Sequence, residues 1–138
     1  MPDVETGAII RELWPLLDVT DINRSVTFYR DQLAFAVVAD DAEPGGQMGW
    51  CRLVRGGASL MLQGPAEEND VPVKPRGRGV CFYFVCDDAD AMYKELSSRG
   101  MQLKKPKVAY YGMKQLYLSD PDGYEICFES PTQERGES

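Results

Sequence analysis

The chain carries the same structural pattern twice, and this repeat limits its possible folds more than any other feature of the sequence. Residues 14–29 have the pattern of a strand, an acidic helix cap and an amphipathic helix, and residues 81–96 have it again. Each run is followed by a hairpin-like tract that closes in a further strand, at residues 55–63 and 120–129. The sequence therefore predicts an α+β protein of two βαβββ units that form a curved mixed sheet around a cleft.

The spacing between matching residues supports a true repeat. The helix-cap residue Asp88 lies 67 positions after Asp21, and Cys127 lies 66 positions after Met61 in the closing strands. Chance similarity between two ordinary strand–helix pairs is the alternative, and the spacing alone leaves it open. We expect one domain, with a first unit at about 10–63, a linker at 64–78, a second unit at 79–130 and a polar tail at 131–138.

In the first unit, residues 12–19 have the composition of a strand, and Asp21 is suited to cap the helix that follows at residues 22–33. The apolar residues of this helix recur at helical spacing, at Ile22, Val26, Tyr29 and Leu33. Three further strands are expected at residues 35–39, 48–54 and 59–63, with a loop at 40–47 and a turn at residues 56–57.

The second unit follows the same order. A strand is expected at residues 80–86, Asp87 or Asp88 is suited to cap the next helix, and Gly100 supplies its left-handed stop. The apolar stripe of this helix is expected at Ala89, Met92 and Leu96. Strands at residues 105–110, 114–119 and 124–129 complete the unit. The turn at residues 120–123 joins the last two, because proline fixes one backbone dihedral there and glycine admits a positive one.

Composition argues against several classes of function. The 138 residues carry a net charge of −7 and no dense cluster of Lys or Arg, so we expect no binding to nucleic acid. No apolar run approaches the roughly 18 residues that span a bilayer, and the N-terminal residues lack the order of a signal peptide. We therefore expect a cytoplasmic protein with no membrane partner. The four cysteines are dispersed without a CxxC pair, which favours neither a zinc knuckle nor a disulfide framework.

Two short motifs give the sequence a resemblance to a known family. The first is D-V-T-D at residues 18–21, followed by R-S at 24–25, F-Y at 28–29 and L-A-F at 33–35. The second is D-P-D-G-Y at residues 120–124. Together they resemble the opening and the final turn of the glyoxalase/bleomycin resistance/dioxygenase superfamily, also called vicinal oxygen chelate proteins, over about residues 13–129. Ala34 departs from the usual glycine of that motif, which predicts local strain or a shifted turn.

The resemblance implies a fold but no single function. The family includes metal-dependent lyases, isomerases, epimerases and dioxygenases, thiol transferases that inactivate fosfomycin, and metal-free proteins that sequester antibiotics of the bleomycin type. In metal-dependent members, the first and last strands of each unit supply His, Gln or Glu ligands. In this chain those positions fall on Trp14, Met61, Cys81 and Cys127. None of these is a ligand that hard divalent ions prefer, so we expect neither a metal nor a cofactor.

Alternation along the strands predicts which other side chains share the cleft. If Cys81 faces the cleft, so does Tyr83, whereas Phe82 and Phe84 pack under the helix. Tyr111 lies in a loop that, by the resemblance, borders the cavity. Alternation in both units and this loop predict no catalytic residue and the following candidate ligand-binding residues: Trp14, Leu16, Asp18, Met61, Cys81, Tyr83, Tyr111, Glu125 and Cys127.

These side chains combine aromatic and aliphatic surface with carboxylates, which suits a large, flat, partly cationic molecule. The combination is similar to the antibiotic-sequestering branch of the family. Our leading hypothesis is a metal-free small-molecule-binding protein that sequesters a flat or cationic compound, such as an antibiotic, and catalyses no reaction. Simple packing in the core or at a dimer contact is the alternative interpretation of Trp14 and Tyr83. We expect a homodimer, because the units of this family pair within one chain or across a dimer.

Two other functions remain open at this point. A shift of the strand register by one residue would change which side chains face the cleft. The chain would then be a metal-dependent lyase of the glyoxalase or dioxygenase kind, with a displaced carboxylate site at Glu125 or Glu129. A scaffold or regulatory protein with an occluded cleft is the other possibility. Covalent catalysis by Cys81 or Cys127 is a poor hypothesis, because the chain has no histidine to raise their thiolate fraction.

Overall fold

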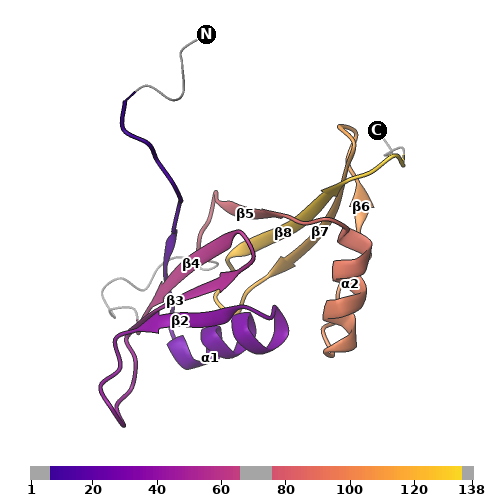
Figure 1. Cartoon of the computed structure of the whole chain (residues 1–138). Coiled ribbons are helices and arrows are strands. Elements are labelled where there is room, and N and C mark those ends of the chain that lie inside the picture. Colours follow the sequence, from indigo (N-terminus) through magenta and orange to yellow (C-terminus); the bar gives the residue numbers. More distant parts are fainter. Residues whose placement is uncertain (1–6, 66–75, 135–138) are drawn as a thin grey trace.

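The computed structural model describes residues 7–65 and 76–134, and its first unit contains a four-stranded sheet, here called sheet A (Figure 1). The strands are β1 (Leu16–Asp18), β2 (Ala36–Asp40), β3 (Trp50–Arg55) and β4 (Ala58–Gln63), in the order β1-β4-β3-β2. Strand β1 runs parallel to β4, and the other pairs are antiparallel. Between β1 and β2, helix α1 (Ile22–Thr27) continues into one π-helical turn, η1 (Phe28–Gln32).

The second unit repeats this arrangement in sheet B. Its strands are β5 (Cys81–Val85), β6 (Lys107–Val108), β7 (Met113–Ser119) and β8 (Glu125–Pro131), in the order β5-β8-β7-β6, with helix α2 (Ala89–Ser98) after β5. The pairing of Leu16 with Met61 in sheet A is matched by the pairing of Tyr83 with Cys127 in sheet B. The predicted repeat is therefore also a repeat in space. Most of the predicted linker and the end of the predicted tail lie outside the described residues.

Both helices begin at aspartates that the sequence predicts. The Asp21 carboxylate accepts a hydrogen bond from the Arg24 backbone at 3.2 Å, and Asp88 accepts from Asp90 and Ala91 at 2.9 and 3.2 Å. The predicted apolar stripes are buried at Ile22, Val26, Tyr29, Leu33, Ala89, Met92 and Leu96. Within residues 7–65 and 76–134, no helix has the length and apolar character needed to cross a membrane.

Two strands are shorter than predicted, and a proline lies beside each. The first strand was expected over residues 12–19 but pairs only from Leu16, because the chain leaves β4 beyond Pro15, whose carbonyl accepts from the Met61 backbone at 2.7 Å. The strand expected at residues 105–110 pairs only at residues 107–108, directly after Pro106, which has no N–H to donate. The other strand boundaries lie within two residues of the prediction.

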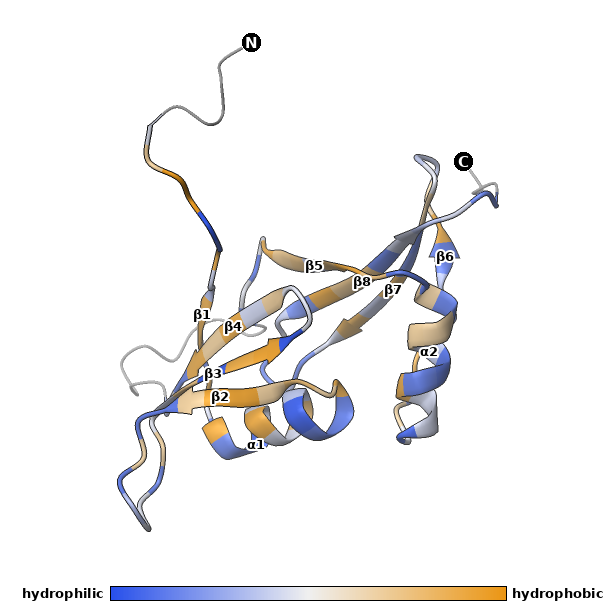
Figure 2. Cartoon of the chain, in the orientation of Figure 1, coloured by the Kyte–Doolittle hydropathy of each residue, from blue (hydrophilic) through white to orange (hydrophobic). Residues whose placement is uncertain are grey.

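The inner faces of the two sheets share one hydrophobic core. Leu17 and Leu62 enter it from sheet A, and Ile126 and Phe128 enter it from sheet B. Figure 2 shows apolar residues along the strands and a further apolar stretch in the N-terminal arm, which runs away from both sheets. Because the inner faces meet in the core, the outer face of each sheet is turned away from the other unit.

The turn between β7 and β8 connects the two units through buried carboxylates. Asp120 accepts a hydrogen bond from the Tyr29 hydroxyl at 2.8 Å, and Asp122 accepts from the Thr20 hydroxyl at 2.8 Å. Arg76, which is 7% exposed, lies 3.7 Å from the Asp122 carboxylate. The motif at residues 120–124 therefore reverses the chain direction and also supplies buried hydrogen bonds between the second unit and the first.

Candidate functional site

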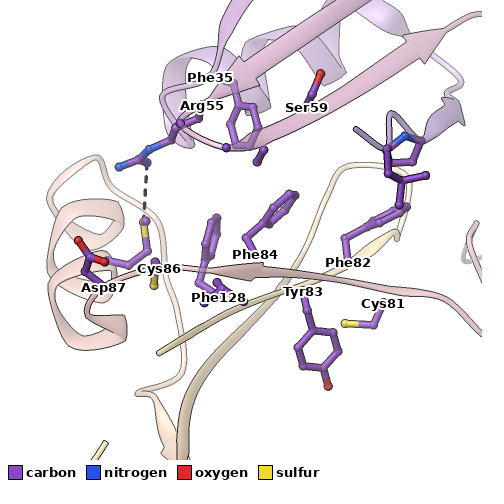
Figure 3. A pocket seen from close by; sticks show the side chains of 17 residues that line it. Phe35, Arg55, Ser59, Cys81, Phe82, Tyr83, Phe84, Cys86, Asp87 and Phe128 are labelled. Carbon is purple, nitrogen blue, oxygen red and sulfur yellow. Dashed lines mark hydrogen bonds between the residues drawn. The ribbon is translucent and has the colours of Figure 1, made fainter. Parts of the chain in front are cut away.

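The predicted binding residues divide into two groups on the outer faces of different sheets. One group belongs to sheet A and the chain before it: Trp14, Leu16, Asp18 and Met61. The other belongs to sheet B and the loop before β7: Cys81, Tyr83, Tyr111, Glu125 and Cys127. The strand register is the predicted one, since Phe82 and Phe84 point toward the first unit whereas Tyr83 points away from it (Figure 3). Within one chain the two groups therefore belong to different sheets.

On the outer face of sheet B, two tyrosines form a bridge over Cys127. Tyr83 on β5 and Tyr117 on β7 are both paired with Cys127, which lies between them on β8. The two hydroxyl groups are 2.8 Å apart, and the rings meet edge to face with centroids 6.3 Å apart. Cys127 is 0% exposed, and this burial raises the pKa of its thiol to about 12. The predicted contact residue Cys127 thus supports the tyrosines from below and is not itself on the surface.

Gln115 connects this bridge to a carboxylate. The Tyr117 hydroxyl donates to Gln115 Oε1 at 3.1 Å, and Gln115 Nε2 donates to Glu129 Oε1 at 3.0 Å and to the Tyr111 hydroxyl. Gln115 is 8% exposed, whereas the three tyrosines are about half exposed. We call the five connected side chains the tyrosine network: Tyr83, Tyr111, Gln115, Tyr117 and Glu129.

The outer face of sheet A is less connected. The Arg52 guanidinium lies 4.0 Å from the centre of the Trp14 ring, a cation–π contact. Gln63 Nε2 donates to the Asp18 carboxylate at 2.5 Å, so one oxygen of Asp18 already accepts a hydrogen bond from a neighbouring strand of sheet A. Leu16 is 47% exposed beside its partner Met61. This face offers apolar surface with an aromatic ring at one side.

The four positions that sequence analysis matched to metal ligands do not fit a hard divalent ion in this chain. Trp14 and Met61 offer an indole and a thioether on one sheet, and Cys81 and Cys127 offer thiols on the other. Among residues 7–65 and 76–134, no three His, Cys, Asp or Glu side chains lie close enough together to hold a metal ion. One oxygen of Glu129, a residue of the displaced site considered above, is engaged by Gln115.

The cysteines are also poorly suited to nucleophilic chemistry. Burial and the Glu125 carboxylate raise the pKa of Cys81, and burial with the Asp40 carboxylate raises the pKa of Cys51 to about 11. A raised pKa leaves little thiolate at neutral pH, and the thiolate is the reactive form. The raised pKa values of Cys81 and Cys127 therefore count against covalent catalysis by either thiol.

A cavity of about 890 Å³ lies between the two units, on the inner side of β5 (Figure 3). Phe82, Phe84 and Phe128 line it from sheet B. At one end stands Arg55, whose guanidinium donates to the two Glu95 oxygens at 2.8 and 3.0 Å, so its charge is matched. Of the predicted binding residues, only Cys81 and Tyr83 line this cavity. Figure 3 shows the Tyr83 ring pointing away from it, so this is not the predicted site.

Sequence reasoning missed Gln115 and Tyr117, the two residues that connect the tyrosine network. Both lie on the outer face of β7, two positions apart, and alternation alone assigns them to one face. The signal that was lacking is the pairing of β7 with β8, which sets Gln115 beside Glu129 and Tyr117 beside Cys127. Strand pairing between neighbouring strands is set by the whole sheet, so one strand's own sequence does not reveal it.

Comparison with known proteins finds similarity over most of the chain. The sequence profile of the Glyoxalase/Bleomycin resistance protein/Dioxygenase superfamily matches residues 13–128. Among curated proteins, none matches this sequence. The crystal structure of TnmS3, an antibiotic binding protein from Streptomyces sp. CB03234, is similar over 91% of this chain and 100% of that chain, with 28% identity and a TM-score of 0.69.

Two further structures share the fold at lower identity. A bleomycin resistance determinant encoded on the transposon Tn5 is 23% identical over 88% of this chain and 98% of that chain, with a TM-score of 0.70. A glyoxalase-related enzyme from Clostridium phytofermentans is 15% identical over 92% of this chain and 99% of that chain, with a TM-score of 0.69. The same fold therefore serves a resistance determinant and an enzyme, and only the residues of the site separate such functions.

Proposed function

Because this chain belongs to the Glyoxalase/Bleomycin resistance protein/Dioxygenase superfamily, we propose that it is a member that binds a small molecule without a metal. The ligand is a flat or cationic compound such as an antibiotic, which the protein sequesters and releases unchanged. The similarity to TnmS3, an antibiotic binding protein, supports this role over that of a metal-dependent enzyme.

The observation that carries the proposal is the tyrosine bridge at the place where metal-dependent relatives hold a ligand. There Tyr83 and Tyr117 cover Cys127, so the surface presents aromatic rings and hydroxyl groups where an enzyme presents metal ligands. Half-exposed tyrosines supply stacking faces and hydrogen bonds with little loss of side-chain freedom. The Glu129 carboxylate beside them favours a ligand with positive charge.

We propose further that a second copy of the chain completes the site. The outer faces expose large apolar side chains, with Leu16 at 47% on sheet A and Val85 at 72% on sheet B. In the N-terminal arm, Ile10 and Leu13 are 90% and 83% exposed. In a homodimer, the outer face of sheet A from one copy covers the outer face of sheet B from the other, and both groups of predicted residues then line one cleft.

The mass of the protein in solution tests this arrangement. Sedimentation equilibrium is expected to give twice the chain mass of 15.4 kDa. Replacement of Leu16 by Glu places a charge in the proposed contact and is expected to shift the protein toward the monomer. The matched control is Val80→Glu just before β5, where the native side chain is also about half exposed and alternation turns it away from the outer face that carries Cys81 and Tyr83. A wild-type protein that sediments as a monomer at high concentration would refute the proposed contact.

Ligand binding is tested by thermal shift and calorimetry with bleomycin and a panel of other flat cationic compounds. A ligand at 100 times its dissociation constant stabilises the folded state by about 2.7 kcal/mol, so binding raises the melting temperature measurably. Flat anionic compounds serve as the control and are expected to bind more weakly. If no compound of the cationic panel stabilises the protein, sequestration of this ligand class is wrong.

Elemental analysis separates this proposal from the rival enzyme. The rival is a metal-dependent lyase with a displaced carboxylate site at Glu125 or Glu129, two residues that lie four positions apart on the same face of β8. A protein purified without chelators is expected to contain no stoichiometric divalent ion. One tightly held ion per chain, lost in a Glu129→Gln variant, would instead support the enzyme.

A further inference from the structure

The tyrosine network has a definite hydrogen-bond direction, which follows from its one carboxylate. A carboxylate accepts hydrogen bonds and does not donate them, so the amide nitrogen of Gln115 is the atom that faces Glu129. The second hydrogen of that nitrogen points to the Tyr111 hydroxyl oxygen. The carbonyl oxygen of Gln115 then accepts the hydrogen of Tyr117, at 3.1 Å. The orientation of the Gln115 amide therefore sets the whole chain of hydrogen bonds.

The hydrogen bond between the two bridge tyrosines has a definite direction as well. The only hydroxyl hydrogen of Tyr117 is used on Gln115, so the 2.8 Å contact with Tyr83 requires Tyr83 to donate. The Tyr83 oxygen keeps a free acceptor position as a result. Tyr111 receives a hydrogen from Gln115, and its own hydrogen has no acceptor among the described residues. The half-exposed tyrosines thus offer one donor, at Tyr111, and one acceptor, at Tyr83.

The charges around the network favour a cationic partner. Glu129 and Glu125 lie on β8 in the middle of the outer face of sheet B, in line with Cys127. Lys107 lies on the edge strand β6, where it pairs with Gln115. Lys114 is directed elsewhere, because its ammonium group is bound by Asp90 and Glu134. A ligand over the tyrosines therefore meets carboxylates first and a lysine only at the far edge of the sheet.

We propose that Gln115 is a positioning residue that orients this network, and that the network selects a planar aromatic cation carrying N–H donors. One N–H group of the ligand pairs with Glu129, another donates to the open oxygen of Tyr83, and Tyr111 donates to an acceptor atom of the ligand. This inference rests on the proposed function and deepens it, since it names the polar pattern that the sequestered compound must carry. Gln115 itself is 8% exposed and acts through the tyrosines.

Two dyes of matched shape and charge test the inference. Proflavine and acridine orange are both flat acridine cations, but proflavine has exocyclic N–H donors where acridine orange has methyl groups. Fluorescence titration of the wild-type protein is expected to show proflavine bound about tenfold more tightly, the gain typical of one charge-assisted hydrogen bond. Equal affinities for the two dyes would overturn the selection of N–H donors.

Variants then identify the residue that orients the network. Gln115→Met keeps the length of the side chain and removes its donor and acceptor. Tyr117→Phe removes the hydroxyl group that connects Tyr83 to Gln115. Both are expected to abolish most of the preference for proflavine over acridine orange while stacking of both dyes persists. The control is Tyr110→Phe, a change at an 84% exposed tyrosine outside the network, which should leave the preference intact.

The ratio of the two affinities distinguishes a positioning role from a merely structural one. If Gln115→Met and Tyr117→Phe both keep the wild-type ratio, the positioning role is wrong. If Gln115→Met does not fold, the result with Tyr117→Phe decides. If bleomycin-type compounds bind and neither dye does, the ligand class is wrong but sequestration stands, whereas failure of all compounds refutes both proposals.

Discussion

At the scale of single residues, Ala34 is the clearest case of a side chain that the backbone does not favour. It has a φ of 59°, and it is the one non-glycine residue with positive φ in the described part of the chain. The sequence singles out this position, because the family motif that residues 33–35 resemble has glycine there. An alanine in the left-handed region costs about 1–2 kcal/mol relative to its preferred conformations. The chain tolerates this cost at the corner between η1 and β2.

Replacement of Ala34 by Gly is therefore expected to stabilise the protein. The gain in unfolding free energy should be about 1 kcal/mol, because relief of the positive φ outweighs the extra freedom of glycine in the unfolded chain. Urea unfolding followed by circular dichroism measures it. The control is Ala36→Gly in β2, which is expected to destabilise by about 0.5–1 kcal/mol. A loss of stability in Ala34→Gly would contradict the assigned conformation.

Tyr29 shows how one hydroxyl group joins the units. It is 0% exposed, donates to Asp120 at 2.8 Å, and has a pKa raised by burial and by the Asp120 carboxylate. Tyr29→Phe keeps the ring and removes the hydroxyl donor, so the buried Asp120 carboxylate loses one of its hydrogen bonds. We expect a loss of about 1–3 kcal/mol in unfolding free energy. Tyr93→Phe on α2 is the comparison, and an equal loss there would mean that the buried contact has no special role.

At the scale of secondary-structure elements, α2 is tied to the end of the β3 strand by a partly buried ion pair. Arg55 at the end of β3 binds the Glu95 carboxylate with two hydrogen bonds, and Arg99 binds the same carboxylate at 2.7 Å. Arg55 also donates to the Leu33 carbonyl at 2.8 Å. These contacts hold the turn between β3 and β4 against the second unit, at the end of the cavity that lies between them.

Glu95→Gln is expected to lower the unfolding free energy by about 1 kcal/mol at neutral pH, the value for a partly exposed bidentate pair. The hydrogen bond from Arg55 lowers the pKa of Glu95, so its contribution is complete above the normal pKa of glutamate and is lost as the pH falls through the lowered value. The difference between variant and wild type, measured by urea unfolding, should therefore narrow between pH 5 and pH 3. Asp31→Asn, in an exposed pair with Arg30, should change stability little.

At the scale of the whole molecule, buried acidic hydroxyls and thiols make the fold sensitive to alkaline pH. Burial raises the pKa of Cys51 to about 11 and that of Cys127 to about 12, and the pKa of Tyr29 is also raised. Each group holds its proton more tightly when folded than when unfolded. Stability is therefore lost as the pH rises from about 9, where unfolded thiols begin to ionise, toward the raised values.

The expected result is a steady fall in melting temperature from pH 9 to pH 12. Scanning calorimetry across this range measures it. Cys51→Ala and Cys127→Ala remove the two thiols and should each flatten the pH dependence while lowering stability at neutral pH through lost packing. A melting temperature that is constant up to pH 12 would mean that these groups ionise in the folded protein as they do in the unfolded chain.

The sequence by itself determined the repeat, the helix caps at Asp21 and Asp88, the apolar stripes and the face on which Tyr83 and Cys127 lie. These features follow from local periodicity, which the order of residues encodes directly. It also placed Ala34 at a strained corner, because a glycine motif demands one backbone conformation.

Only the tertiary structure decided which predicted residues are neighbours. It buried Cys127 beneath two tyrosines, connected Gln115 and Tyr117 to Tyr83, and placed the group at Trp14 and the group at Tyr83 on different sheets. The physical reason is that these relations depend on strand pairing and on which faces of the two sheets pack in the common core. Both are set by contacts between residues far apart in the chain, and no local pattern records them.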